Sequence, residues 1–234
     1  MGNQRAFVRQ NTILKPPSLV PELRLHLADR AVPLWELTEE ELAEKDLPPP
    51  YWAFAWAGGQ ALARYIIDHP ETAAGKRVLD FASGSGLVAV AALWVSAAHV
   101  VAADIDAFSI AAIALNAEAN GLEGGLETVR RDMLDEPVLA ADGQPLFDLV
   151  LAGDVCYEKP MAERAIAWLR RHAAAGATVL MGDPGRSYVP DSGLTRLAEY
   201  MVPTPRELED SDLRRTVVWR VEAPQEDHAA LTPR

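Results

Sequence analysis

The sequence predicts an α/β protein built on one sheet, and two observations support this prediction. Between residues 76 and 181, short apolar runs alternate with helical segments, and this βαβ order requires parallel strands with helices on both faces of the sheet. A chain of 234 residues with 49% hydrophobic content can also bury the core of one such domain. We therefore expect a Rossmann-like, doubly wound sheet of seven strands, mostly parallel, with an antiparallel last strand.

Residues 1–50 are expected to form an extension and not a separate domain. Thr38 and Glu41 form a capping box that predicts a short helix through Ala43, and three prolines at residues 48–50 end the segment. The main domain is expected to span residues 51–222. A polar tail over residues 223–234 should be frayed.

The main domain begins with a predicted helix over residues 51–68. Its apolar residues recur at spacings of three and four, which places them on one face. Gly58 and Gly59 permit close approach of another element along that face.

The alternating region and the end of the chain supply the remaining elements. The predicted strands are residues 76–81, 99–105, 126–130, 147–153 and 177–181, and the predicted helices are residues 87–96, 107–120 and 161–174. After them we expect a helix over residues 195–200 and two strands, near residues 200–204 and 214–221. The short connection between these two strands predicts that they pair in antiparallel fashion.

Composition and charge argue against several classes of protein. The net charge of −12 disfavours nucleic acid, whose binding depends on Lys and Arg. Cys156 is the single cysteine and is expected to be a packing residue, and the five histidines are not spaced as metal ligands, so we expect no metal. Residues 87–95 form the longest apolar stretch, shorter than the roughly 20 residues that span a bilayer. With no secretory signal, we expect a cytoplasmic monomer that does not bind membranes; an organellar presequence is the alternative.

The loop after the first strand of the alternating region is the first candidate site. Asp80 lies near the strand's end, and Gly84 and Gly86 follow in the loop. In doubly wound sheets, ligands bind outside the carboxyl ends of the strands, and glycines let the backbone approach them closely. The alternative is a tight turn that binds nothing. Residues 84–89 also match the GxGxxA fingerprint of nicotinamide dinucleotides, and Asp104 lies about 20 residues further on, where either nucleotide ligand would place its ribose.

Asp80 separates the two ligands on electrostatic grounds. It lies four residues before Gly84, where a diphosphate would approach and be repelled. S-adenosylmethionine (SAM) carries a positive sulfonium and an ammonium and has no phosphate. The charge at Asp80 therefore favours SAM as the ligand.

Two segments, VLDFASGSG at residues 78–86 and VVAADID at residues 100–106, resemble the first two motifs of class I SAM-dependent methyltransferases. The resemblance implies that SAM is the cofactor and S-adenosylhomocysteine (SAH) the product. It implies that the methionine part lies at the glycine loop, the ribose at Asp104 and the adenine after the third strand. The implied cofactor-binding residues are Asp80, Ser83, Gly84, Gly86, Asp104, Ile105, Asp132 and Met133. For Asp132 the alternative is a solvated loop carboxylate.

The segment FDLVLAGDVCYE at residues 147–158 is the second candidate site. Asp154 follows a buried strand, and Tyr157 follows three residues later, which places both side chains at the carboxyl end of that strand. This arrangement resembles the seven-strand lysine methyltransferases that carry a DxxY motif. In that interpretation Asp154 and Tyr157 are catalytic: Asp154 accepts a hydrogen bond from the incoming amine and also contacts the cofactor, and Tyr157 orients the amine. The alternative is an Asp that caps the next helix and a Tyr that packs on it.

The Trp-rich stretch PPYWAFAWAGGQAL at residues 49–62 and GDPGR at residues 182–186 resemble the electron transfer flavoprotein beta subunit lysine methyltransferases and their bacterial relatives. The resemblance implies a protein substrate, the beta subunit of that flavoprotein. Trp56 would contact the cofactor, while Trp52, Asp183 and Arg186 would contact the substrate, the tryptophan through cation–π and apolar contact. The alternatives are core tryptophans and an Asp183–Arg186 pair within the loop. Glu158 is expected to be an exposed charge.

Two other functions remain open from the sequence. The first is methyl transfer to a small amine or to another protein, because substrate choice depends on loops. The second is an NAD-dependent oxidoreductase or a nucleotide-binding module without catalytic activity. Binding of NAD rather than SAH would indicate the second.

Overall fold

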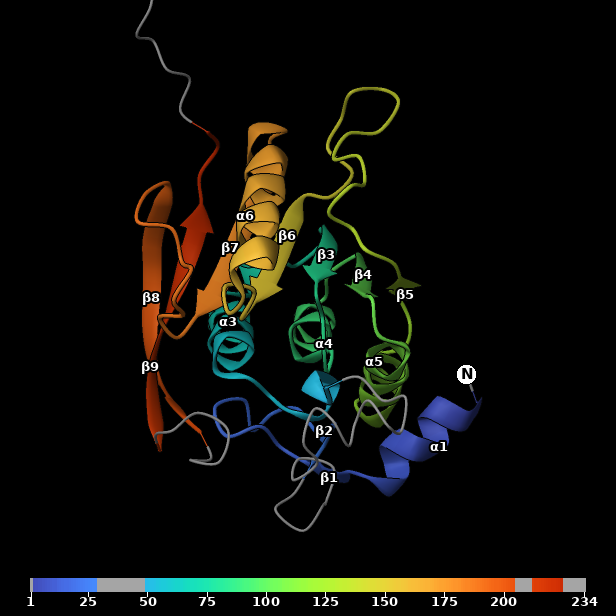
Figure 1. Ribbon diagram of the computed structural model, residues 1–234. Helices are drawn as coiled ribbons and strands as arrows, with labels where there is room; N and C mark the ends of the chain where they lie inside the picture. The colour runs from blue at the N-terminus through green and yellow to red at the C-terminus, as the bar shows by residue number, and fades with distance from the viewer. Residues whose placement is uncertain (1, 29–48, 205–211, 225–234) are drawn as a thin grey trace, which may run out of the picture.

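The structure is a computed structural model, and it describes residues 2–28, 49–204 and 212–224 (Figure 1). Its centre is a seven-stranded sheet with the order β5-β4-β3-β6-β7-β9-β8. The strands are β3 (Arg77–Phe81), β4 (His99–Asp104), β5 (Leu126–Arg130), β6 (Leu149–Gly153), β7 (Thr178–Asp183), β8 (Leu194–Pro203) and β9 (Leu213–Val221). The first five are parallel, and β9 pairs antiparallel with both β7 and β8. The predicted fold class is confirmed.

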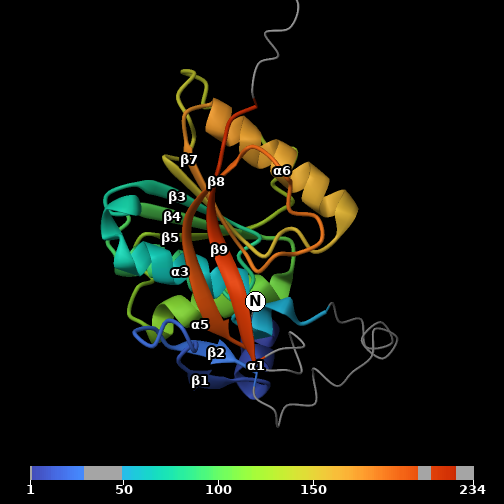
Figure 2. The same ribbon diagram turned by 90° about the vertical axis from the view of Figure 1, so that its left-hand side faces the viewer.

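Helices cover both faces of the sheet (Figures 1 and 2). Helices α3 (Ala57–Asp68), α4 (Leu87–Trp94) and α5 (Ala107–Ala119) pack on one face, and α6 (Lys159–Ala174) packs on the other. Successive residues of β6 alternate between the faces: Leu149 and Leu151 join the core under α3 and α4, whereas Val150 and Ala152 join the core under α6. This two-residue period is what a strand buried on both faces requires.

Residues 2–28 form a small layer beneath α5, seen at the bottom of Figures 1 and 2. It contains α1 (Gly2–Gln10) and a two-stranded antiparallel sheet of β1 (Ile13–Lys15) and β2 (Leu25–Leu27). Asn116 of α5 ties this layer to the glycine loop, because its side chain accepts a hydrogen bond from the His26 amide at 2.7 Å and donates one to the Ser85 carbonyl at 2.7 Å. The helix predicted from Thr38 and the polar tail lie outside the described residues, except for the tail's first two residues, which have no regular structure.

Two predicted helices differ from the structure. Residues 51–68 do not form one helix: a 3-10 turn, η2 (Tyr51–Ala53), precedes α3, and Phe54 and Trp56 are extended. The helix starts late because Trp52 and Phe54 pack in a separate core against α5. The predicted helix over residues 195–200 was wrong, since this segment lies within β8 and pairs with β9 along its length. Pairing with a neighbouring strand outweighs the weak helical preference of six residues.

His172 of α6 is a buried polar residue in the core. It is fully buried, its ring lies 4.3 Å from that of Trp168, and neither ring nitrogen has a hydrogen-bond partner within the described part of the chain. Burial, helped by the Arg171 charge, lowers the pKa of His172 to about 4. The ring is therefore neutral in the folded protein at neutral pH.

This burial predicts a pH dependence of stability. Between pH 6.5 and about 4 the unfolded chain binds a proton at His172 and the folded chain does not, so the free energy of unfolding falls as the pH falls, by on the order of 2–3 kcal/mol. His172→Phe should remove this contribution. The free energy of unfolding, measured by urea denaturation at several pH values from 7 to 4, should fall less steeply with pH for the variant than for the wild type. The same dependence on pH for both proteins would contradict the prediction.

Candidate functional site

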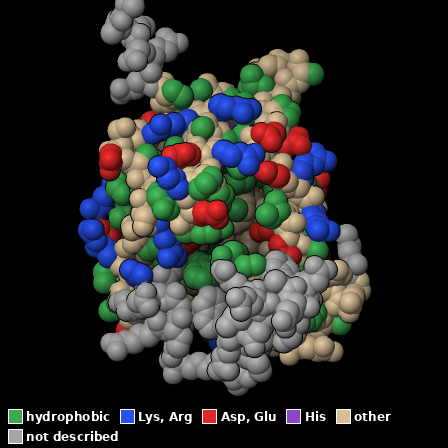
Figure 3. All heavy atoms as spheres, viewed as in Figure 1, with side chains coloured by type: hydrophobic (Ala, Val, Ile, Leu, Met, Phe, Trp, Pro, Cys, Tyr) green, Lys and Arg blue, Asp and Glu red, His purple; other side chains and the backbone are tan. Residues whose placement is uncertain are grey.

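A cavity of about 580 Å³ opens at the carboxyl ends of β3, β4 and β6. The chain turns from β3 toward β4 on one side and returns to β6 on the other, so this is the point where the strand order reverses and where doubly wound sheets bind ligands. Nine predicted site residues line the cavity: Trp56, Gly84, Asp104, Ile105, Asp132, Met133, Asp154, Tyr157 and Arg186. Figure 3, which has the same view as Figure 1, shows acidic, basic and apolar side chains interspersed on the upper part of the molecule.

The glycine loop after β3 is fixed from behind by Asp80. This carboxylate is 1% exposed and accepts hydrogen bonds from the Ser83 hydroxyl at 2.5 Å and the Ala89 amide at 3.0 Å. Burial raises the pKa of Asp80 to about 7, against the lowering effect of these two hydrogen bonds. Asp80 and Ser83, both predicted to contact the ligand, are not among the residues that line the cavity.

Gly86, another residue predicted to contact the ligand, does not line the cavity either. It adopts φ 79°, and a Cβ there would lie 3.0 Å from the Ile113 backbone of α5. Its absent side chain therefore serves packing of the loop against α5. The residues of this loop that line the cavity are Ala82 and Gly84.

Asp104, the last residue of β4, connects the loop with the cavity. Its Oδ2 accepts a hydrogen bond from the Gly84 amide at 2.8 Å, and its Oδ1 accepts one from the Asp106 amide at 2.9 Å. Burial raises the pKa of Asp104. Ile105 beside it is 69% exposed. Asp132 is exposed and accepts a hydrogen bond from the Leu134 amide at 3.0 Å. The charged side chains that line the cavity are instead Asp104, Asp106, Asp132 and Asp154, together with Arg131, Arg164 and Arg186.

Asp154 follows β6 in a left-handed backbone conformation, with φ 55°. Ala82, after β3, has φ 52°. Left-handed residues other than glycine cost of order 1 kcal/mol or more and cluster at functional sites. Here the Asp154 amide donates to the Gly182 carbonyl at 3.0 Å, which holds the turn.

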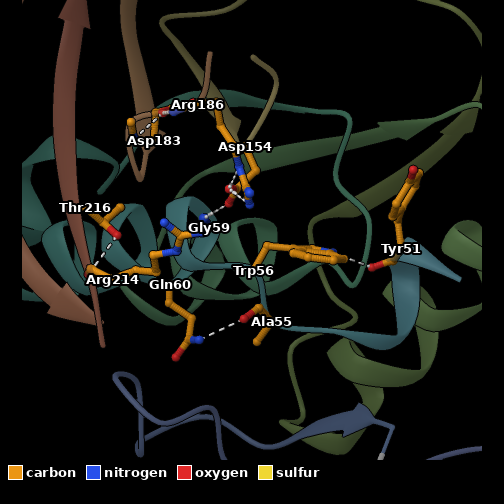
Figure 4. A network of polar contacts seen from close by, with 11 residues as sticks. Tyr51, Ala55, Trp56, Gly59, Gln60, Asp154, Asp183, Arg186, Arg214 and Thr216 are labelled. Carbon is orange, nitrogen blue, oxygen red and sulfur yellow. Dashed lines mark hydrogen bonds and ion pairs between the residues drawn. The ribbon is translucent and has the colours of Figure 1, made fainter. Parts of the chain in front are cut away.

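The Asp154 carboxylate contacts two other elements (Figure 4). Its Oδ2 accepts a hydrogen bond from the Gly59 amide in the first turn of α3 at 3.1 Å. Its Oδ1 accepts from Arg186 Nη2 at 2.9 Å and from Arg186 Nε at 3.3 Å. Helix amino termini and guanidinium groups both stabilise a carboxylate. This interaction was not predicted, because Asp154 and Arg186 are 32 residues apart; their common position after neighbouring strands was the available signal.

Four glycines allow α3 to reach Asp154. A Cβ on Gly58 or on Gly182 would overlap the carbonyl oxygen of the other residue, and a Cβ on Gly153 would lie 2.9 Å from the Gly59 Cα. The helix therefore crosses β6 and β7 at backbone contact, as the sequence predicted for Gly58 and Gly59.

Arg186 is held by a turn that Asp183 organises. Asp183 Oδ1 accepts hydrogen bonds from the Gly185 and Arg186 amides, both at 2.7 Å. Its side chain is 1% exposed, and burial raises its pKa to about 6. The predicted substrate contact of Asp183 needs correction: it lines not the main cavity but a second one of about 290 Å³. The alternative, an Asp183–Arg186 pair within the loop, is present as a hydrogen bond from the Arg186 backbone amide to Asp183. The Arg186 guanidinium binds Asp154 instead.

Aromatic side chains form one wall of the cavity. The Trp56 indole donates to the Tyr51 carbonyl at 2.9 Å (Figure 4), and the rings of Tyr51 and Tyr157 lie 5.7 Å apart. Tyr157 is 44% exposed, and partial burial raises its pKa. Tyr51 was missed as a site residue because the sequence placed it at the start of a helix.

Trp52 does not reach the cavity. It is 2% exposed and stacks on Phe108 of α5 with a centroid distance of 6.0 Å. The predicted substrate contact is therefore wrong, and the alternative, a core tryptophan, describes its position. Cys156 is buried 3.8 Å from the Met181 sulfur, and burial raises its pKa to about 12. Glu158 is exposed, as expected.

The described residues contain no group of three or more His, Cys, Asp and Glu side chains placed to hold a metal ion. Among the helices described, none has the length and apolar character needed to cross a membrane.

Comparison with known proteins agrees with this geometry. The chain superimposes with a TM-score of 0.53 on a methyltransferase solved in complex with SAH, at 15% identity, over 85% of this chain and 53% of that one. It superimposes with a TM-score of 0.51 on a Streptococcus mutans protein described as a SAM-dependent methyltransferase, at 15% identity, over 71% of this chain and 49% of that one. The family model of ribosomal protein L11 methyltransferase (PrmA) matches residues 60–153. The two superpositions show that the chain has the Rossmann-like fold of these methyltransferases.

Curated relatives identify the family. Over 221 residues the chain is 35% identical to the electron transfer flavoprotein beta subunit lysine methyltransferase of Rattus norvegicus, which covers 92% of this chain and 83% of the relative. The protein of that name from Danio rerio is 38% identical over 220 residues, with 92% and 81% covered. The chain belongs to the family of electron transfer flavoprotein beta subunit lysine methyltransferases.

The close crossing of α3 predicts opposite effects for two neighbouring glycines. Gly58→Ala should lower the free energy of unfolding by about 1–3 kcal/mol, because its Cβ would overlap the Gly182 carbonyl and lie 2.5 Å from Asp154 Oδ2. Gly59→Ala is the matched control, since its Cβ meets no atom closer than 3.9 Å. It should be neutral or stabilising by up to about 1 kcal/mol. Equal unfolding midpoints in urea for the two variants would contradict the contact.

Proposed function

We propose that this protein transfers a methyl group from SAM to lysine ε-amines of the electron transfer flavoprotein beta subunit. The observation that carries the proposal is the position of Asp154 and Tyr157 in one cavity with Gly84 and Asp104. Relatives that share 35–38% identity over 92% of the chain are named for this reaction. In line with the expectation from the sequence, we propose that it acts in the cytoplasm as a monomer, which cell fractionation and light scattering would test.

The cavity residues fit the chemical groups of the donor. The Asp104 carboxylate lines the cavity at the end of β4, where it would accept hydrogen bonds from the ribose hydroxyls. The apolar side chains of Ile105 and Met133 would flank the adenine, and Asp132 would accept from its amino group. Gly84 would let the methionine part approach the backbone, next to Trp56 and Asp154. When bound, SAM supplies an electrophilic methyl group on a sulfonium.

The residues around Asp154 would position the acceptor. A lysine side chain has an apolar stem and a polar end, and the rings of Tyr51, Trp56 and Tyr157 form an apolar wall that ends at the Asp154 carboxylate. Tyr157 and Asp154 would orient the amine toward the methyl group. Holding the two reactants in line and away from water is a main source of rate enhancement for such a transfer.

The donor assignment predicts selective binding. Isothermal titration should detect SAH binding and no tight binding of NAD. Asp104→Ala should weaken SAH by about 10- to 100-fold, the loss expected for hydrogen bonds to a charged group. Asp142→Ala, which changes an exposed carboxylate of a surface loop, is the matched control and should bind SAH like the wild type. Tight NAD binding without SAH binding would overturn the enzyme class.

The acceptor assignment predicts a mass change in one protein. Purified beta subunit incubated with enzyme and SAM should gain whole methyl groups by intact-mass spectrometry, and peptide mapping should place them on lysines. Asp154→Ala should slow the reaction by about 100-fold, whereas Glu158→Gln should react like the wild type. An unchanged mass with the wild-type enzyme would refute this substrate, and labelling of a small amine or another protein instead would identify the alternative.

A further inference from the structure

The acceptor end of the cavity contains a cation of the protein's own. The Arg186 guanidinium donates to Asp154 Oδ1, with distances of 2.9 Å from Nη2 and 3.3 Å from Nε (Figure 4). Asp154 Oδ2 accepts from the Gly59 amide. The two side chains are 21% and 10% exposed, and both line the cavity. The pair is therefore largely shielded from solvent. Charge interactions are stronger in such a site than in water.

The chemistry of methyl transfer makes the charge at this position important. A lysine amine has a pKa of about 10.4 and is almost entirely an ammonium ion at neutral pH. The ammonium has no lone pair and does not react. A carboxylate without a cationic partner would bind the ammonium and raise its pKa further, since an opposite charge nearby favours the charged form.

We propose that Arg186 is a positioning residue that acts through Asp154: by neutralising this carboxylate, it lowers the pKa of the acceptor amine and favours the neutral nucleophile. The inference rests on the proposed function, because it requires that a lysine amine is the acceptor. Asp154 can still accept a hydrogen bond from the neutral amine, but it no longer holds the proton there.

The local structure suits Arg186 to this role. Asp183 fixes the Arg186 backbone through two hydrogen bonds of 2.7 Å, to the Gly185 and Arg186 amides. Arginine remains charged at every pH at which lysine titrates. The guanidinium is therefore both fixed in place and constant in charge while the acceptor loses its proton.

Other charged or titratable groups around the cavity lie on different elements. Asp104 and Asp106 follow β4, Arg131 and Asp132 follow β5, and Arg164 lies on α6. Asp183 lies behind the Arg186 turn, Glu158 is exposed beside Tyr157, and burial raises the pKa of the Tyr157 hydroxyl, so that it is neutral at neutral pH. Of the cationic side chains that line the cavity, Arg186 is the one that pairs with Asp154 among the described residues.

Methyl transfer from SAM to the acceptor amine needs no further reactant. The acceptor ammonium first loses one proton to solvent. The lone pair of the amine then forms the new N–C bond while the C–S bond breaks and its electron pair remains on sulfur. The methylated ammonium that results releases a second proton to solvent. Arg186 changes the first equilibrium and takes no part in bond formation.

The test is the pH profile of single-turnover methyl transfer to the flavoprotein beta subunit, with saturating enzyme and SAM, between about pH 6.5 and 10. In this profile the rate rises with pH as the acceptor loses its proton, and we call this part the acidic limb. Arg186→Gln should move the acidic limb to higher pH by about 1 unit. At a given pH on the limb the variant should transfer methyl about tenfold more slowly, and at high pH its rate should recover toward its plateau. Arg186→Lys keeps the charge, so its limb should stay where the wild-type limb lies.

Asp154→Asn provides a second variant with the opposite sign. Asparagine tolerates the left-handed backbone of this position, and its loss of charge removes the anion that favours the ammonium form of the acceptor. Its transfer should be slow, but its acidic limb should lie at lower pH than that of the wild type. Circular dichroism and SAH titration would show whether Arg186→Gln folds. If it does not, the pH profile of Asp154→Asn still tests the proposal, and an acidic limb at the wild-type pH or above would contradict it.

A readout without turnover is the acceptor pKa itself. With 13C at the lysine ε-carbons of the beta subunit and SAH in the cavity, NMR titration should give an acceptor pKa below that of the free subunit for the wild type, and a higher value for Arg186→Gln. Superimposable limbs and equal pKa values for the two proteins would overturn the role of Arg186. Absence of lysine methylation by the wild type would instead refute the proposed function on which it rests.

Discussion

Backbone contact between α3 and the strands β6 and β7 is the constraint on which the site depends. Gly58 and Gly182 lie so close that neither has room for a side chain. Because of this contact the Gly59 amide reaches the Asp154 carboxylate at 3.1 Å. The carboxylate is then held between the start of a helix and the Arg186 guanidinium. A slightly wider crossing would leave it with one partner fewer and a less defined position.

The turns after β3 and β6 both contain a residue in a strained backbone conformation. Ala82 and Asp154 take left-handed conformations without being glycines, and surrounding contacts must hold them there. Behind Ala82, Asp80 binds Ser83 and the first turns of α4. Behind Asp154, the Gly182 carbonyl accepts its amide. Buried polar groups thus shape the cavity from behind, while other residues face the ligand.

The sequence predicted the features that local pattern determines. Alternating apolar runs located the five parallel strands within about two residues, and the glycine loop with Asp104 located the cofactor end of the cavity. It could not determine which side of a loop faces the cavity, so it did not predict that Asp80 binds Ser83 and the Ala89 amide behind the cavity lining. Trp52 and the segment 195–200 were misassigned because the partners that bury or pair them, Phe108 and β9, are distant in sequence. The Asp154–Arg186 pair is set by strand order, which no local pattern records.

A crystal structure of the enzyme with SAH and a lysine-containing segment of the flavoprotein beta subunit would test the central claim most directly, that Asp154, fixed by Gly59 and Arg186, receives the acceptor amine. We expect the lysine nitrogen within hydrogen-bond distance of Asp154, in line with the sulfur of SAH, with the Arg186 pair and the Gly59 hydrogen bond intact. A lysine bound away from Asp154, or an Arg186 side chain turned out of the cavity, would contradict it.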